Sequence, residues 1–125
     1  YLRVSDLIKN NQTPTVDIDS SIARVIVEIS EKRLGVTAVL ENEKLVGIIT
    51  DGDLRRMLNK TTNINHFTAK DIMGKDPKIV QQGAMAIEAL EKLEQDSITQ
   101  ILVVDAQEKY VGVVHLHDLI KEGIF

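Results

Sequence analysis

The stretch Val46-Gly47-Ile48-Ile49-Thr50-Asp51-Gly52-Asp53-Leu54 returns later as Val111-Gly112-Val113-Val114-His115-Leu116-His117-Asp118-Leu119. Valine, glycine, aspartate and leucine recur at matching places, 65 residues apart. Residues 4–8 and 69–73 echo each other at the same spacing, and Pro-x-hydrophobic at 14–16 returns at 77–79. An internal repeat decides the architecture before any local pattern does. The sequence therefore predicts one repeat at residues 1–60, a polar Asn- and Thr-rich linker at 61–67, and a second repeat at 68–125.

The sequence pattern of each half predicts the element order strand, helix, strand, strand, helix. In the first half the strands are residues 15–18, 36–40 and 45–50, and the helices fill 19–34 and 51–58. Apolar residues at 22, 25, 26 and 29 have helical spacing, Asp19 or Ser20 is the expected cap, and Gly35 is the expected end. The uninterrupted apolar run 36–40 indicates a strand that is buried on both faces. It pairs antiparallel with 45–50, because the turn between them is short.

In the second half, the strands are predicted at 78–80, 98–104 and 110–114, and the helices at 84–95 and 116–122. A half of about 55 residues buries too little surface to be stable alone. We therefore expect an α/β (α+β) fold in which two β-α-β-β-α repeats pack sheet against sheet with pseudo-twofold symmetry.

Composition excludes several classes of function. The chain has 125 residues, a net charge of −4 and 3% aromatic residues, which argues against a nucleic-acid binder. It has no cysteine, so disulfides, thiolate catalysis and cysteine zinc sites are excluded, and a reducing, cytoplasmic location is expected. No apolar run approaches the roughly 18 residues of a membrane span, so no membrane partner is expected.

Two β-α-β-β-α units that each carry Gly-hydrophobic-x-Thr-x-x-Asp, with His in place of Thr in the second, resemble a tandem pair of CBS domains, the Bateman module. The stretches 50–56 and 115–119, together with the opening Arg3-Val4-x-Asp6-Leu7, also resemble the C-terminal part of the arabinose-5-phosphate isomerase family of the Kdo and capsule pathways. The resemblance covers the whole chain. In that family a sugar isomerase (SIS) domain precedes the CBS pair and carries the active site.

The resemblance therefore implies that this chain has no catalytic residues and no cofactor of its own. It implies a regulatory cleft between the repeats that binds a nucleotide such as AMP or ATP, or the nucleotide sugar CMP-Kdo as a feedback signal. It also implies a homodimer through the CBS helices and a tetrameric parent enzyme. An Ala-rich helix near Ala84, Ala86 and Ala89 suits such close helix packing. The alternative is an oligomerisation platform of the same enzyme with no physiological ligand.

Thr50 and Asp53 are the leading candidates for ligand contact. A carboxylate can accept hydrogen bonds from both hydroxyls of a ribose, and a threonine hydroxyl beside it can reach a ribose or phosphate oxygen. The helix that begins here suits an anion. Thr-x-x-Asp is also a helix capping box, and the two roles are compatible.

The second repeat carries His115, His117 and Asp118 at the equivalent junction. An imidazole can donate to a phosphate or carboxylate, and the change from Thr to His predicts two unequal half-sites. Two histidines and a carboxylate also raise the possibility of a metal, but no third histidine lies close in sequence, so no metal is expected. Arg55 and Arg56 are candidate phosphate ligands. The CBS resemblance adds three residues at the inner starts of the central strands, Thr37, Thr99 and Gln100.

Overall fold

The computed structural model describes residues 1–124, which form two compact units. The continuous unit is Pro14–Pro77, and the split unit joins Tyr1–Thr13 to Lys78–Phe125. The continuous unit therefore differs from the first sequence repeat at both ends. The first 13 residues pack with the second repeat, and the segment that leads into the second repeat packs with the first.

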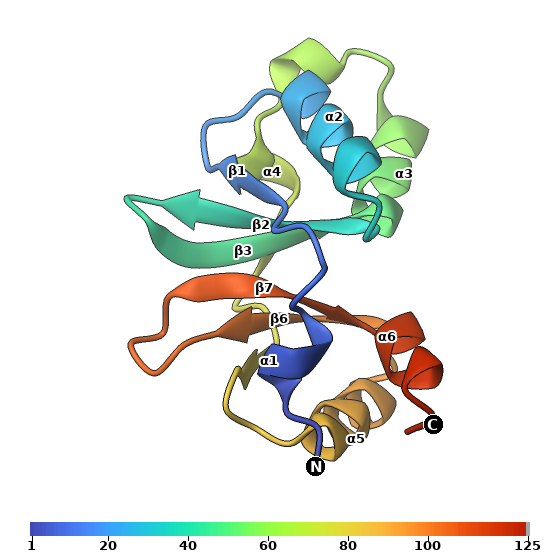
Figure 1. The fold of residues 1–125 in the computed structure, drawn as a ribbon. Coiled ribbons are helices and arrows are strands. Elements are labelled where there is room, and N and C mark those ends of the chain that lie inside the picture. The colour runs from blue at the N-terminus through green and yellow to red at the C-terminus, as the bar shows by residue number, and fades with distance from the viewer. Residues whose placement is uncertain (125) are drawn as a thin grey trace. The chain divides into compact units, whose positions relative to one another are not determined.

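The continuous unit is a four-stranded sheet with helices on one face (Figure 1). Its strands β1 (Thr15–Asp17), β2 (Val36–Glu41), β3 (Lys44–Thr50) and β4 (Gly74–Lys75) lie in that order. β1 is parallel to β2, and the other pairs are antiparallel. The helices are α2 (Ile22–Lys32), α3 (Asp51–Lys60), the 3-10 turn η1 (Ile64–His66) and α4 (Ala69–Ile72).

The core of the continuous unit lies between the sheet and helices α2 and α3. Apolar residues of α2 recur at helical spacing and bury one face of that helix, as the sequence predicted. The buried cluster consists of Val16, Ile18, Ile22, Val25, Ile29, Val39, Ile49, Leu54, Met57 and Ala69. Gly47 is required where β4 approaches β3, because a Cβ there would lie 2.9 Å from the Gly74 carbonyl oxygen.

The split unit repeats this plan with a three-stranded sheet. Its elements are α1 (Val4–Leu7), β5 (Ile79–Gln81), α5 (Ala86–Asp96), β6 (Gln100–Val104), β7 (Tyr110–His115) and α6 (Leu116–Lys121), with strand order β5-β6-β7. The N-terminal segment is bound through its backbone: Val4 N–H donates to Ala84 O, and Ala86 N–H donates to Leu2 O, both at 2.9 Å. The Leu2 carbonyl thus accepts a backbone N–H from the first turn of α5, whose N-cap residue makes no side-chain hydrogen bond.

Most of the sequence prediction is confirmed. The mixed α/β class, the strand-helix-strand-strand-helix order in each unit, and the burial of β2 on both faces are as expected. Helix α2 is capped by Ser21, which accepts from Arg24 N–H, and not by Asp19 or Ser20 as predicted. Ser20 instead closes the preceding turn by accepting from Asp17 N–H.

The structure does not place the three alanines on one exposed helix face. Ala84 lies before α5 and is half-buried, whereas Ala86 and Ala89 are buried in the core of the split unit and offer no surface to a second copy. The homodimer itself stays a prediction. The short helices α1 and α4 and the strand β4 were not predicted. Within residues 1–124, no helix has both the length and the apolar character needed to cross a membrane.

A buried carboxylate ties α2 to the first strand of the continuous unit. Glu28 is 3% exposed, and its Oε2 accepts the Thr15 N–H at 2.8 Å. Its Oε1 accepts from Arg24 Nη2 at 2.9 Å. In the split unit the corresponding helix–strand hydrogen bond has donor and acceptor exchanged, because the exposed Lys92 ammonium on the helix donates to the Ile79 carbonyl of the strand at 2.9 Å. In both units a charged side chain on the helix thus bonds the backbone of an edge strand.

Candidate functional site

Thr50 and Asp53 meet where β3 ends and α3 begins. Thr50 is the N-cap, and its Oγ1 accepts the Asp53 N–H at 3.1 Å. Asp53 Oδ2 accepts the Thr50 N–H at 2.9 Å, which completes a reciprocal capping box. The motif therefore has a structural role, because it caps α3. It fixes the direction of the Asp53 carboxylate, which is the first requirement for a binding group.

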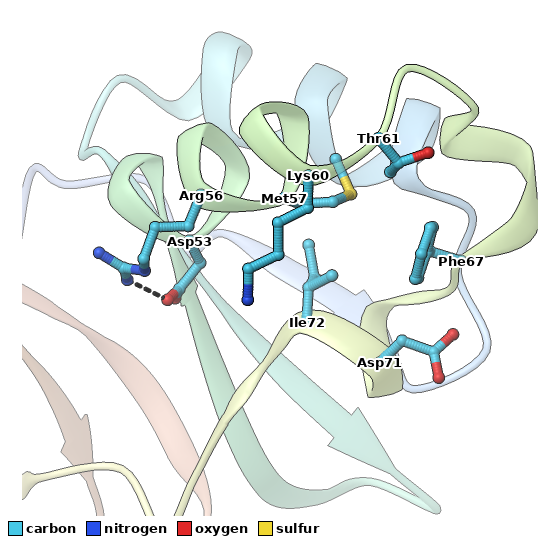
Figure 2. A pocket seen from close by; sticks show the side chains of 8 residues that line it. All are labelled: Asp53, Arg56, Met57, Lys60, Thr61, Phe67, Asp71 and Ile72. Carbon is cyan, nitrogen blue, oxygen red and sulfur yellow. Dashed lines mark hydrogen bonds and ion pairs between the residues drawn. The ribbon is translucent and has the colours of Figure 1, made fainter.

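The other oxygen of Asp53 is paired with Arg56. Arg56 Nη2 donates to Oδ1 of Asp53, one turn further along α3, as the dashed line in Figure 2 marks. A carboxylate offers about four acceptor positions, two on each oxygen. Each oxygen of Asp53 therefore uses one and keeps one. A vicinal diol, which presents two hydroxyl donors, can still be accepted by both oxygens at once.

Asp53 and Arg56 line a hollow of about 300 Å³ between α3 and the segment around α4 (Figure 2). Its apolar lining comes from Met57, Phe67 and Ile72. Its other lining residues are Lys60, Thr61 and Asp71. The hollow thus joins an apolar wall to two cations and two carboxylates. Such a lining can hold a small molecule that carries both hydroxyls and an anionic group.

The sequence prediction missed most of this lining. Lys60 lies one turn beyond Arg56 on the same helix, a spacing that was visible in the sequence. Thr68 and Asp71 repeat the Thr-x-x-Asp pattern and form a second capping box, with Asp71 Oδ2 accepting from Thr68 N–H at 2.8 Å. Phe67 fell within the segment that was predicted to be only a linker.

Several predicted residues are not among those that line the hollow. Arg55 is exposed and is not among the residues that line it. Thr37 is fully buried, with its hydroxyl bonded to the Ala38 carbonyl at 3.1 Å. In the split unit, Thr99 is exposed just before β6, and its hydroxyl donates to Gln100 Oε1 at 2.8 Å. Ligand contact by these residues stays a prediction.

The equivalent junction of the split unit has the same plan but different partners. His115 is the N-cap of α6, and its Nδ1 accepts the His117 N–H at 2.9 Å. Asp118 Oδ2 accepts the His115 N–H at 2.8 Å. The same oxygen accepts the Asn11 side-chain amide at 3.0 Å. The sequence prediction did not include Asn11, since no motif marks it.

Burial lowers the pKa of His115 below its ordinary value, the nearby Asp118 carboxylate opposes that shift, and His117 adds to it. A neutral imidazole is also what the cap needs, because only an unprotonated Nδ1 can accept an N–H. The two imidazole rings lie edge to face, with centroids 6.5 Å apart. Residues 1–124 contain no group of three histidine, aspartate or glutamate side chains arranged to hold a metal.

Comparison with known proteins places these junctions in a family. An arabinose 5-phosphate isomerase KdsD from Francisella tularensis is 43% identical over 96% of this chain, and the chain spans 37% of that relative's length. A CBS domain protein, PAE2072 from Pyrobaculum aerophilum complexed with AMP, superimposes with a TM-score of 0.87 at 22% identity, covering 98% of this chain and 95% of that one. CBSX2 in complex with AMP superimposes with a TM-score of 0.78 at 20% identity, over 99% and 97%.

The family model described as CBS domain matches residues 4–60 and 69–124, which together include both junctions. Each match covers one strand-helix-strand-strand-helix repeat of the sequence. The chain belongs to the CBS domain family, as a pair of CBS domains similar to part of the arabinose 5-phosphate isomerases KdsD.

Proposed function

We propose that this CBS pair is the regulatory nucleotide-binding part of an arabinose-5-phosphate isomerase, and that it binds the ribose phosphate of its ligand beside Asp53. The observation that carries the proposal is the Asp53 carboxylate, which is held by a capping box at the edge of a hollow with two cations. Both Asp53 oxygens keep an acceptor position for a ribose diol. Arg56 and Lys60 supply positive charge for a phosphate.

The comparisons support the class of ligand. Two proteins with the same fold are described in complex with AMP. At about 300 Å³ the hollow is at the lower end of the range for small-molecule sites. It therefore suits the ribose phosphate part of AMP or ATP, with the rest of the ligand outside it. The similarity to isomerases of the Kdo pathway makes CMP-Kdo a further candidate ligand. It carries a ribose and an additional carboxylate.

The proposed parent enzyme is cytoplasmic, and an upstream SIS domain carries out the aldose-ketose isomerisation. Similarity to isomerases that are longer than this chain supports this arrangement. Ligand binding regulates the parent only through a difference in affinity between two states of the enzyme, typically about 1–3 kcal/mol. Deleting these residues should therefore remove nucleotide sensitivity and preserve isomerisation. Turnover and inhibition that are both unchanged by the deletion would contradict the regulatory role.

Thermal unfolding of the 125-residue chain with AMP, ATP, CMP and CMP-Kdo tests the binding claim. A native-state ligand at 100 times its dissociation constant stabilises by about 2.7 kcal/mol, a shift of several degrees for a chain of this size. Asp53→Asn should reduce the shift by about half or more, since an amide cannot accept a diol on both atoms. The matched control is Asp51→Asn, in the same helical turn and exposed. No shift with any nucleotide, or a full shift in Asp53→Asn, would refute the proposal.

The second candidate is an oligomerisation platform. Each unit exposes two large apolar side chains on its helices: Val27 and Leu58 in the continuous unit, and Ile87 and Ile120 in the split unit, all 45–48% exposed. Exposed apolar helix faces favour a homodimer through the helices, with a tetrameric parent. Sedimentation of wild type and Leu58→Lys tests this candidate. A dimer that the substitution dissociates, and whose stability no nucleotide changes, would favour the platform over the sensor.

A further inference from the structure

We propose that the chain binds one nucleotide, at the Thr50–Asp53 junction, because Asn11 closes the matching junction of the split unit. The inference rests on the proposed function and sets its stoichiometry. The two junctions share a capping box and a carboxylate at the third helical position. They differ in what else binds that carboxylate.

Asn11 is fully committed as a donor. Its Nδ2 donates to Asp118 Oδ2 at 3.0 Å and to the Val113 carbonyl at 3.1 Å. A side-chain amide nitrogen has two hydrogens, and these two bonds use both. The backbone N–H of Asn11 is also bound, to Ile8 O at 3.0 Å. The amide is therefore held in place against β7 and Asp118.

Counting acceptor positions separates the two carboxylates. Asp118 Oδ2 accepts from both His115 N–H and Asn11 Nδ2, so both of its positions are filled. At Asp53 the two bonds fall on different oxygens, and each oxygen keeps one position. A ribose diol that bridges a carboxylate, with one hydroxyl on each oxygen, needs one position on each oxygen. Asp53 can accept it as it stands, whereas Asp118 cannot until Asn11 leaves.

The difference is encoded in the sequence. Asn11 lies in the loop between α1 and β1, and the corresponding segment between α4 and β5 consists of Met73, strand β4 (Gly74–Lys75), Asp76, Pro77 and Lys78. None of these residues has a side-chain amide. The continuous unit therefore has no counterpart of the Asn11 tie, and Asp53 is paired by Arg56 from its own helix instead. Arg56 is exposed, so a phosphate can draw it away from Asp53 more readily than a ligand can displace Asn11.

Calorimetric titration of the 125-residue chain with AMP tests the inference. We expect one site in the wild type, at least tenfold weaker binding in Asp53→Asn, and a dissociation constant within twofold of wild type in Asp118→Asn. The Asp118→Asn side chain keeps an acceptor for His115 N–H, so the fold should persist. NMR provides a readout that a purely structural role would not move. At AMP saturation the Asn11 side-chain amide signals should keep their positions, while the Gly52 backbone signal shifts.

Asn11→Ala shows whether the tie exists in solution, with Asn10→Ala as its exposed neighbour and control. Asn11→Ala should lower the melting temperature, and Asn10→Ala should not. Two AMP sites per chain, or a loss in Asp118→Asn as large as that in Asp53→Asn, would overturn the inference and leave the proposed function standing. So would moving Asn11 signals, or an Asn11→Ala protein as stable as wild type. Absence of binding by AMP, ATP, CMP and CMP-Kdo alike to the wild type would overturn both.

Discussion

Replacing Glu28 by alanine should destabilise the continuous unit. Glu28 is a buried carboxylate, 3% exposed, and it accepts hydrogen bonds from the Thr15 backbone and from Arg24. Alanine removes both acceptors and leaves the Thr15 N–H without the Glu28 bond. The loss therefore falls on the link between α2 and the edge strand β1.

The structure sets the size of the effect. A hydrogen bond to a charged acceptor contributes about 1.5–3 kcal/mol net, which applies to the 2.8 Å Thr15 bond. The Arg24 side chain is 50% exposed, so its i,i+4 pair with Glu28 adds only about 0.3–0.5 kcal/mol. The sum is about 2–3.5 kcal/mol. For a chain of this length, that is a fall of roughly 10 °C in melting temperature.

Thermal and urea unfolding followed by far-UV circular dichroism measure this effect. Glu28→Gln keeps a neutral acceptor for Thr15 N–H and should lose roughly half as much stability as Glu28→Ala. Glu31→Ala removes an exposed carboxylate from the same helix and should change the free energy of unfolding by less than about 0.5 kcal/mol. A Glu28→Ala protein within about 0.5 kcal/mol of wild type, or a Glu31→Ala loss as large as that of Glu28→Ala, would show that the buried carboxylate does not stabilise this unit.

Three further predictions concern the polar ties and the close approach. Lys92→Ala should lower the free energy of unfolding, measured in urea, by less than about 1 kcal/mol, since the Lys92 bond to the Ile79 carbonyl is exposed to solvent. A loss as large as that of Glu28→Ala would contradict this. Gly47→Ala should lower the free energy of unfolding by about 1–3 kcal/mol, because the new Cβ meets the Gly74 carbonyl. Gly83→Ala should be tolerated, because no heavy atom beyond the two neighbouring residues lies within 4 Å of a Cβ there. Equal losses in the two variants would argue against the close approach of β3 and β4. Burial lowers the pKa of His115 below the ordinary value of 6.5. Below pH 6.5 the unfolded chain therefore binds a proton at this histidine more readily than the folded chain does. The free energy of unfolding should decrease as the pH falls from 6.5 to the lowered pKa. His115→Thr should remove this share of the pH dependence, and an unchanged profile in that variant would exclude His115 as its source.

Local patterns predicted the elements well and their partners poorly. The apolar spacing in α2 and the uninterrupted run in β2 report on burial within one element, so helix and strand could be predicted. The choice of Ser21 over Ser20 as the cap depends on the path of the preceding turn, which propensity does not encode. The short helices α1 and α4 are four residues each, too short for a hydrophobic period to reveal them.

In the candidate site, too, residues close together in sequence could be predicted, and contacts between distant residues could not. Thr50, Asp53 and Arg56 lie within seven residues of sequence, and a motif was enough to find them. Asn11 and Asp118 are 107 residues apart, and they meet only because the N-terminal segment packs in the split unit. No spacing rule predicts such a contact. Phe67 was missed for a related reason, since a polar composition around it marked a linker and concealed a residue that lines the hollow.

A crystal structure of the 125-residue chain with AMP would show whether Asp53 binds the ribose. The account predicts a nucleotide whose two ribose hydroxyls lie within hydrogen-bond distance of the two Asp53 oxygens, with its phosphate near Arg56 or Lys60. It also predicts that Asn11 still bonds Asp118 in the same crystal. A nucleotide bound without any contact to Asp53 would contradict the account.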